Sequence, residues 1–257
     1  MHRYGVRFGG IRRLYSSDGL ERLRRAHVCV IGVGGVGSWA VEALARSGIG
    51  ALTLVDMDDI CVSNVNRQIH ALDSEIHKPK VDSLAVRVNA INPACVVHAQ
   101  RAFFVQSNAA TLLEPRFDFV LDAIDSVREK ALCVALCREL KLPVITSGGA
   151  GGRRDPTQVR VDDLSRASHD RLLQSLRKTL RSDYGFPRGE RKFGVECVFS
   201  PEPPVFPHHD GTVCETREEG GELKLDCRGG LGSATFVTGT FGFTAAARIV
   251  ARLAAGS

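Results

Sequence analysis

Four charged side chains in the first half of this 257-residue chain could together act on a nucleoside triphosphate. Attack on the α-phosphorus of a triphosphate is helped by cations beside the departing pyrophosphate and by a carboxylate that holds Mg²⁺. Arg67 and Lys80 supply the cations, and Asp125 supplies the carboxylate. Asp56 suits the hydroxyls of a ribose. Each residue alone is explained equally well as an ordinary surface or helix-end residue, so the hypothesis depends on their combination.

A glycine-rich turn precedes these residues and predicts where phosphates would bind. The apolar run 28–31 breaks into clustered glycines and then opens into a helical pattern. At such a junction, backbone N–H groups and a helix N-terminus face one point, and their partial positive charge favours phosphate. Asp56 ends the next apolar run, as the acidic residue of a dinucleotide fingerprint does. The cofactor-binding glycines that we predict are Gly32, Gly34, Gly35 and Gly37.

Alternating strand and helix patterns predict the scaffold that positions these residues. The expected fold class is α/β, with a doubly wound, Rossmann-like and mostly parallel sheet. The polar segment 56–68 is too long for a simple turn, and long loops at the carboxyl ends of parallel strands are where such sheets hold ligands. We predict strands at about 27–31, 52–55, 95–98, 117–125 and 143–147, and helices at about 36–48, 80–91, 107–113 and 126–140.

The second half of the chain is less regular, and we interpret residues 1–257 as one domain. Its nucleotide-binding core covers about 26–152, and an elaborated, basic part covers about 153–257. Within the elaborated part we predict a strand at 157–161, a helix with one basic face at 164–180 and a loop at 201–207.

Composition and hydropathy indicate a soluble, globular protein. The chain is 44% hydrophobic and 25% charged, and its first 15 residues contain no continuous apolar signal region, so a cytoplasmic location is expected. Residues 229–247 carry no charge, but five glycines and four threonines make them a poor membrane span. We expect a buried or dimer-interface helix there.

The net charge of +5 is concentrated in one stretch. Between Arg153 and Lys192 there are eleven lysines and arginines and six acidic residues, and 11 − 6 = 5 accounts for the whole excess. A local basic face suits RNA, although a solvated surface helix would have the same composition.

The cysteines do not predict a zinc site. Eight are present, no CxxC pair occurs, and Cys133 and Cys137 are four residues apart on a predicted helix, as two core residues would be. A reactive thiol in the second half could serve sulfur chemistry or a covalent intermediate, but a structural role is favoured for each candidate. The candidates are Cys197, Cys214 and Cys227, the last being the first choice.

In combination, the chemistry-bearing residues resemble the signature of the ThiF/MoeB/ubiquitin-activating family of E1-like adenylating enzymes. The signature residues are Gly32, Gly34, Gly35, Gly37, Asp56, Asn64, Asn66, Arg67, Gln68, Lys80, Asp122 and Asp125. The resemblance implies that Arg67 and Lys80 contact the phosphates of ATP and that Asp56 contacts the ribose. It further implies that Asn64 and Gln68 belong to the nucleotide site, that Asp125 holds Mg²⁺, and that an arginine of a neighbouring subunit reaches the ATP. Arg13 is our candidate for that arginine, with Arg7 as the alternative.

Further motifs resemble one bacterial branch of this family, which acts on threonylcarbamoyladenosine in tRNA. These motifs are found at 64–72, 122–128, 146–152, 155–158, 197–200, 210–214 and 240–243. The resemblance implies ATP-dependent cyclisation of N6-threonylcarbamoyladenosine at position 37, through a carboxyl adenylate. It also implies tRNA as partner and no DNA, a homodimer, and a possible sulfur-transfer protein.

Three alternatives remain open from the sequence. The nearest is adenylation of the C-terminus of a small ubiquitin-like or sulfur-carrier protein. An NAD-dependent oxidoreductase would use the same glycines and Asp56 but would leave Arg67, Lys80 and Asp125 without a role. A noncatalytic RNA-binding module would not need Asp125.

Overall fold

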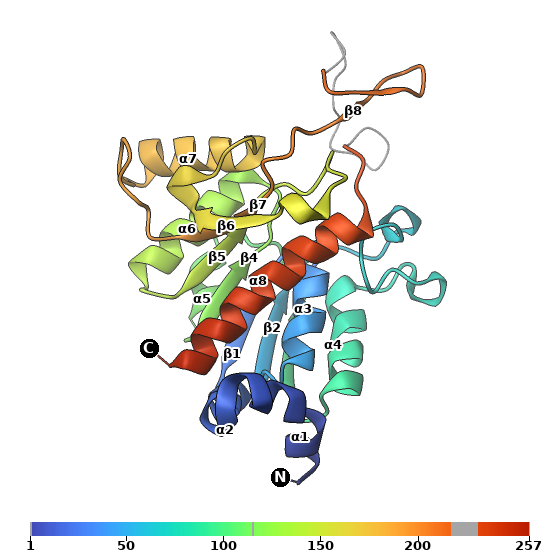
Figure 1. The fold of residues 1–257 in the computed structure, drawn as a ribbon, viewed down its shortest axis with the longest axis vertical. Helices are drawn as coiled ribbons and strands as arrows, with labels where there is room; N and C mark the ends of the chain where they lie inside the picture. Colours follow the sequence, from blue (N-terminus) through green and yellow to red (C-terminus); the bar gives the residue numbers. More distant parts are fainter. Residues whose placement is uncertain (1, 115, 217–230, 257) are drawn as a thin grey trace.

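The computed structural model describes residues 2–114, 116–216 and 231–256, in which strands and helices alternate (Figure 1). The strands of the main sheet are β1 (His27–Ile31), β2 (Ala51–Val55), β3 (Val96–Gln100), β4 (Phe119–Asp122), β5 (Val144–Ser147), β6 (Arg160–Asp163) and β7 (Glu196–Phe199). The helices are α1 (His2–Arg7), α2 (Gly9–Arg25), α3 (Gly37–Arg46), α4 (Lys80–Ile91), α5 (Ala109–Leu113), α6 (Val127–Glu139), α7 (Arg171–Asp183) and α8 (Thr235–Ala255).

The main sheet has seven strands in the order β3-β2-β1-β4-β5-β7-β6. All neighbours pair in parallel except β6 and β7, which are antiparallel. The predicted α/β class and the mostly parallel, doubly wound sheet are therefore confirmed. The direction of winding reverses between β1 and β4, and open α/β sheets bind their ligands beyond the carboxyl ends of the strands at such a point.

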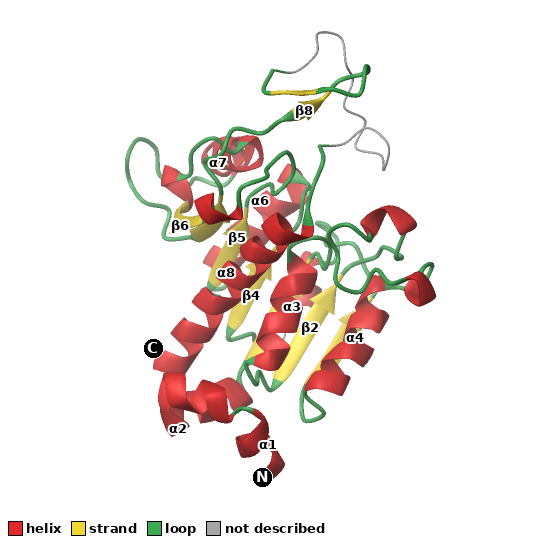
Figure 2. Cartoon of the chain, turned by 45° about the vertical axis from the view of Figure 1, so that its right-hand side comes forward, coloured by secondary structure: helices red, strands yellow, loops and turns green. Residues whose placement is uncertain are grey.

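The sheet separates two hydrophobic cores, and its inner strands β1, β2, β4, β5 and β7 contribute to both of them. In β1, Val28 and Val30 pack in a core with α3, α4 and α8, whereas Cys29 and Ile31 pack in a second core with α5, α6 and α7. Alternate residues of a strand point to opposite faces, so a run that is buried on both faces reads as continuously apolar. Figure 2 shows α3, α4 and α8 together on one face of the sheet.

Several elements differ from the sequence-based expectations. The arginine-rich lead is helical as α1 and α2, because α2 buries Leu20 and Leu23 beneath the amino ends of the strands. The predicted helix 164–180 begins only at Arg171, because the Asp170 carboxylate caps it by accepting from the Leu173 N–H at 3.0 Å. The predicted strand 157–161 is displaced to β6. Strand β7 and the two-stranded hairpin β8 (Phe206–Pro207) and β9 (Val213–Cys214) were not expected.

Residues 235–247 of the uncharged stretch form the first part of α8, which packs closely on α3. A side-chain carbon at Gly242 would lie 2.5 Å from the Val36 carbonyl oxygen, so the contact requires glycine. The expected burial is confirmed on the side that carries Val237, Phe241 and Ala245. No helix in the described part of the chain is both long and apolar enough to cross a membrane.

Candidate active site

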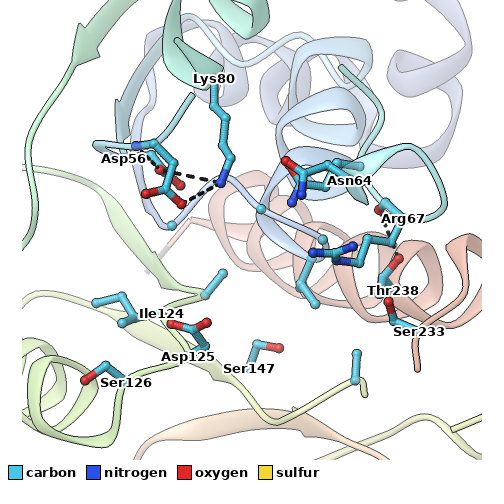
Figure 3. Close-up of a pocket in the computed structure, with 18 of the residues that line it drawn as sticks. Asp56, Asn64, Arg67, Lys80, Ile124, Asp125, Ser126, Ser147, Ser233 and Thr238 are labelled. Carbon is cyan, nitrogen blue, oxygen red and sulfur yellow. Dashed lines mark hydrogen bonds and ion pairs between the residues drawn. The ribbon is translucent and has the colours of Figure 1, made fainter. Parts of the chain in front are cut away.

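A cavity of about 1370 Å³ opens at the carboxyl ends of β1, β2, β4 and β5, at the reversal of the sheet (Figure 3). Loops that are far apart in the sequence form its walls. Most of the predicted site residues line it together: Gly32, Gly34, Gly35, Asp56, Asn64, Arg67, Gln68, Lys80 and Asp125.

The glycine turn holds the end of β1 against the start of α3. Gly32 has a φ of +84°, and a side-chain carbon there would lie 2.8 Å from the Ala123 carbonyl oxygen. A side-chain carbon at Gly37 would lie 1.9 Å from the Gly32 carbonyl oxygen. Gly37 does not line the cavity, and the close packing of the turn requires glycine at this position, while its contact with a ligand stays a prediction. At Gly34 the nearest atom, the Gln68 Nε2, is 3.7 Å away, and a side chain would project into the cavity.

Asp56 links the two loops that meet above β1 and β2. Its Oδ2 accepts from the Val33 N–H at 2.9 Å, and its Oδ1 accepts from the Asp58 N–H at 2.9 Å. Burial raises the pKa of Asp56 above its usual value, and the nearby Lys80 ammonium opposes this rise. The carboxylate therefore fixes the glycine turn, and it also faces the cavity.

Lys80 is the first residue of α4, and its ammonium group extends into the cavity. Its Nζ lies 2.7 Å from the Asp58 Oδ2 and 4.0 Å from the Asp56 Oδ1. The Lys80 side chain is 7% exposed, whereas that of Asp58 is 56% exposed. A cationic group is thus held at the wall by the partly buried carboxylate of Asp56 and the solvated carboxylate of Asp58.

The 56–68 loop brings Asn64, Arg67 and Gln68 to the neighbouring part of the wall. The buried Asn64 amide accepts from the Cys61 N–H at 3.1 Å and thereby closes a short turn. The Arg67 guanidinium donates to the Ser63 carbonyl oxygen at 2.6 Å. The Oε1 of buried Gln68 has no hydrogen-bond partner, which leaves an acceptor available to a ligand.

The main chain of Arg67 is anchored by α3, the helix after the predicted glycine turn, and by α8, which sequence reasoning did not place at the site. The Arg67 carbonyl oxygen accepts from Trp39 Nε1 at 2.9 Å and from Thr238 Oγ1 at 3.2 Å. Thr235 Oγ1 donates to the Asn66 carbonyl oxygen at 2.6 Å. Helices α3 and α8 therefore position the arginine, although neither supplies a charge at this point.

Asp125 projects from the opposite wall, across the cavity from Lys80 (Figure 3). Its loop is held by Asp122, whose Oδ1 accepts from the Ile124 N–H at 3.1 Å. The Asp122 Oδ2 in turn accepts from Lys130 Nζ at 2.8 Å and from Thr146 Oγ1 at 2.6 Å. Both ionic side chains are fully buried. Asp122 is thus a structural anchor for the loop, and its partner Lys130 carries no local sequence signal.

A second glycine run, 148–151, closes the cavity beside β5, and a buried ion pair anchors it. The Asp170 Oδ2 accepts from the Gly149 N–H at 2.9 Å and lies 3.5 Å from Arg153 Nη2. Arg153 also donates to the carbonyl oxygens of Gly149 and Gly151. The prediction that the charges of 153–192 form one basic surface is therefore wrong for Arg153, which is buried.

Other cavity residues had no sequence pattern that could identify them. Phe103, Phe104 and Val105 line the cavity from the segment after β3, and Phe103 is 62% exposed. Cys61 also lines it, although it was not among the cysteines considered.

Arg13 and the two cysteine candidates that the structure describes, Cys197 and Cys214, do not line this cavity within one chain. Cys197 is buried in β7, and burial raises the pKa of its thiol, which disfavours the nucleophilic thiolate. Cys214 lies in the β9 hairpin, and Cys227 lies outside the described residues. Arg13 lies on α2, at the amino end of the sheet and away from the cavity (Figure 1).

A parallel sheet with a glycine turn, paired cations and a facing carboxylate defines an adenylate-forming α/β protein. Residues 10–253 match the ThiF family, and the chain belongs to that family. It is 49% identical to the tRNA threonylcarbamoyladenosine dehydratase of Escherichia coli K12, over 97% of this chain and 94% of that protein. A structure of TcdA (CsdL) superposes with a TM-score of 0.91 and 46% identity, covering 99% of this chain and 96% of the other. The structure of E. coli TcdA in complex with ATP superposes with a TM-score of 0.87 and 45% identity, covering 98% of this chain and 95% of the other.

Proposed function

We propose that this protein catalyses the ATP-dependent dehydration of N6-threonylcarbamoyladenosine at position 37 of tRNA, through an adenylated carboxyl group. The observation that carries the proposal is the cavity, in which Arg67 and Lys80 occupy one wall and Asp125 the other. The similarity to the E. coli dehydratase over nearly the whole chain supports the choice of substrate.

The wall residues fit a triphosphate and its metal. Arg67 and Lys80 neutralise the phosphates, Asp56 and Asn64 hold the nucleoside part, and Gln68 offers its unpartnered Oε1. The open space at Gly34 allows the phosphates to approach the main chain. Asp125 supplies hard oxygen ligands of the kind that Mg²⁺ prefers, and Mg²⁺ would add positive charge at the phosphates.

The reaction needs an activated carboxyl group, because a carboxylate is a poor electrophile. A carboxylate oxygen of the substrate attacks the α-phosphorus of ATP, the bond from that phosphorus to the bridging oxygen breaks, and pyrophosphate leaves. The substrate's own carbamoyl group then attacks the acyl carbon and loses a proton, the ring closes, and AMP departs. The second step is intramolecular, so it gains from proximity and needs no nucleophile from the protein. Positioning and charge neutralisation are the protein's contribution.

We also propose that the protein works as a homodimer in which Arg13 of one subunit reaches the ATP of the other. Arg13 is exposed and belongs to α2, which lies at the end of the sheet opposite the cavity (Figure 1). On α8, Phe236 and Phe243 remain 57% and 47% exposed, and a partner surface would cover them. A sulfur-transfer protein remains a possible further partner.

Pyrophosphate exchange tests the substrate. Purified protein is offered ATP with tRNA that carries threonylcarbamoyladenosine, with the same tRNA lacking the modification, or with a small carrier protein ending in Gly-Gly. Exchange with the modified tRNA alone is expected, together with loss of one water from the nucleoside by mass spectrometry. Exchange with the carrier alone would refute the substrate assignment and would favour carrier-protein adenylation.

A further inference from the structure

A second cavity, of about 590 Å³, lies along the outer side of α7 and the loop that follows it. We call it the α7 groove, and its lining is basic and hydroxylic. The residues that line it are Gln174, Ser175, Arg177, Lys178, Arg181, Ser182 and Arg188. Four of these seven are cations and none is acidic, so the groove carries uncompensated positive charge.

Arg181 bonds main-chain oxygens at the groove, and among the described residues no carboxylate forms an ion pair with a groove arginine. Arg181 donates to the carbonyl oxygens of Pro187 at 3.2 Å and Gly189 at 3.4 Å. The Nη1 of Arg177 is buried without a hydrogen-bond partner. Burial lowers the pKa of Arg177, and repulsion from Arg181 lowers it further. An anion in the groove would relieve the repulsion between these cations.

The carboxylate of Asp170 attracts Arg177 electrostatically, but it is already bonded to other groups. Asp170 accepts from the N–H groups of Gly149 and Leu173 and is paired with Arg153. Ser175 and Ser182 add hydroxyl donors at the groove, as phosphate oxygens require.

We infer that the α7 groove binds a backbone phosphate of the RNA substrate, outside the catalytic cavity. This inference rests on the proposed function, because it names the same RNA as ligand. Helix α7 connects the two places: Leu172, in its first turn, lines the catalytic cavity, and Arg181 lines the groove. The groove residues on α7 run from Gln174 to Ser182, two to ten residues beyond Leu172, or about 3–15 Å along the helix at about 1.5 Å per residue. A stacked strand covers this range in about one to four base steps, at about 3.4 Å each.

Charge-reversal variants test the groove. Lys178→Glu and Arg188→Glu change exposed side chains of the groove, and Arg160→Glu changes an exposed arginine of the same basic stretch that lies on β6, outside the groove. Filter binding with unmodified and modified tRNA gives the Kd from 50 to 200 mM salt. Inorganic phosphate, compared with chloride at equal ionic strength, serves as competitor.

We expect each groove variant to bind both tRNAs about tenfold more weakly at low salt, with the slope of log Kd against log salt reduced by about one. Pyrophosphate release should show a raised KM for tRNA and an unchanged KM for ATP. Arg160→Glu should leave all these values unchanged. Inorganic phosphate should displace the tRNA only at concentrations well above that of the RNA, and this result would support a site for a backbone phosphate.

Three results would overturn the inference. Wild-type affinity and salt slope in the groove variants would refute the groove while leaving the proposed function intact. Equal losses in Arg160→Glu would show a diffuse charge effect instead of a site. If the wild-type protein bound no tRNA and released no pyrophosphate with it, the proposed function and the groove would fail together.

Discussion

Replacing Lys130 with methionine should remove the buried cation that holds the Asp122 loop while preserving most of the side chain's length. Both members of the pair are fully buried, and Nζ lies 2.8 Å from the Asp122 Oδ2. Removing one partner of such a pair leaves an uncompensated buried charge, which costs about 3–5 kcal/mol of unfolding free energy. For a protein of this size, that loss lowers Tm by about 6–20 °C.

Denaturant unfolding of Lys130→Met, Asp122→Asn and the double variant gives a double-mutant cycle. The double variant should be destabilised by much less than the sum of the single variants, with a coupling energy of about 2 kcal/mol or more, because neither charge is then left alone. Lys192→Met, at an exposed lysine, serves as control and should change stability by less than about 0.5 kcal/mol.

The same variants should also impair catalysis at temperatures where they remain folded. Asp122 accepts from the Ile124 N–H, and Ile124 is adjacent to Asp125, so loosening the anchor displaces the carboxylate that we assign to Mg²⁺. A displacement of about 1 Å corresponds to about a hundredfold loss of rate. A loss of less than 1 kcal/mol in Lys130→Met, or strictly additive single variants, would refute the buried anchor.

The remaining predictions concern three sites. Asp125→Ala should slow pyrophosphate release by roughly 10²-fold or more with an unchanged Tm, since Asp125 is exposed to the cavity; near-normal release would contradict its assigned role. Gly37→Ala should lower Tm strongly because of the contact at 1.9 Å, whereas Gly34→Ala should keep Tm and weaken ATP binding in calorimetry. Burial lowers the pKa of His70 to about 4 from 6.5, so the unfolded chain takes up its proton first as the pH falls. Up to about 3 kcal/mol of stability should therefore be lost between pH 6.5 and 4, and His70→Leu should flatten that part of the pH profile.

Local patterns were sufficient to predict the parts of the fold that local physics determines. The strand, the glycine turn and the helix around Gly32 are fixed by residues within about twenty positions of one another. Helix α4 was predicted at its observed bounds because its apolar spacing and the following Asn92-Pro93 are both local. The same reasoning placed Lys80 at the start of that helix.

Tertiary contacts determine the rest of the site. Lys130 pairs with Asp122 only because α6 packs beneath the carboxyl end of β4, and Trp39 reaches the Arg67 carbonyl oxygen only because α3 lies beside the 56–68 loop. The start of α7 depends on Asp170, whose second oxygen holds Gly149. None of these contacts produces a recognisable pattern, such as a periodic repeat or a fixed spacing of residues, in the sequence.

Lys80 and Lys130 are both buried near the cavity, but they differ in the exposure of the carboxylate that each one pairs with. This difference decides which lysine is available to a ligand. Lys130 and Asp122 are both fully buried, so releasing either charge from the other is costly. Lys80 is buried too, but Asp58, its partner at 2.7 Å, is 56% exposed and can return to water at little cost. Phosphate oxygens can therefore replace Asp58 beside Lys80, while the loop that carries Asp125 stays anchored.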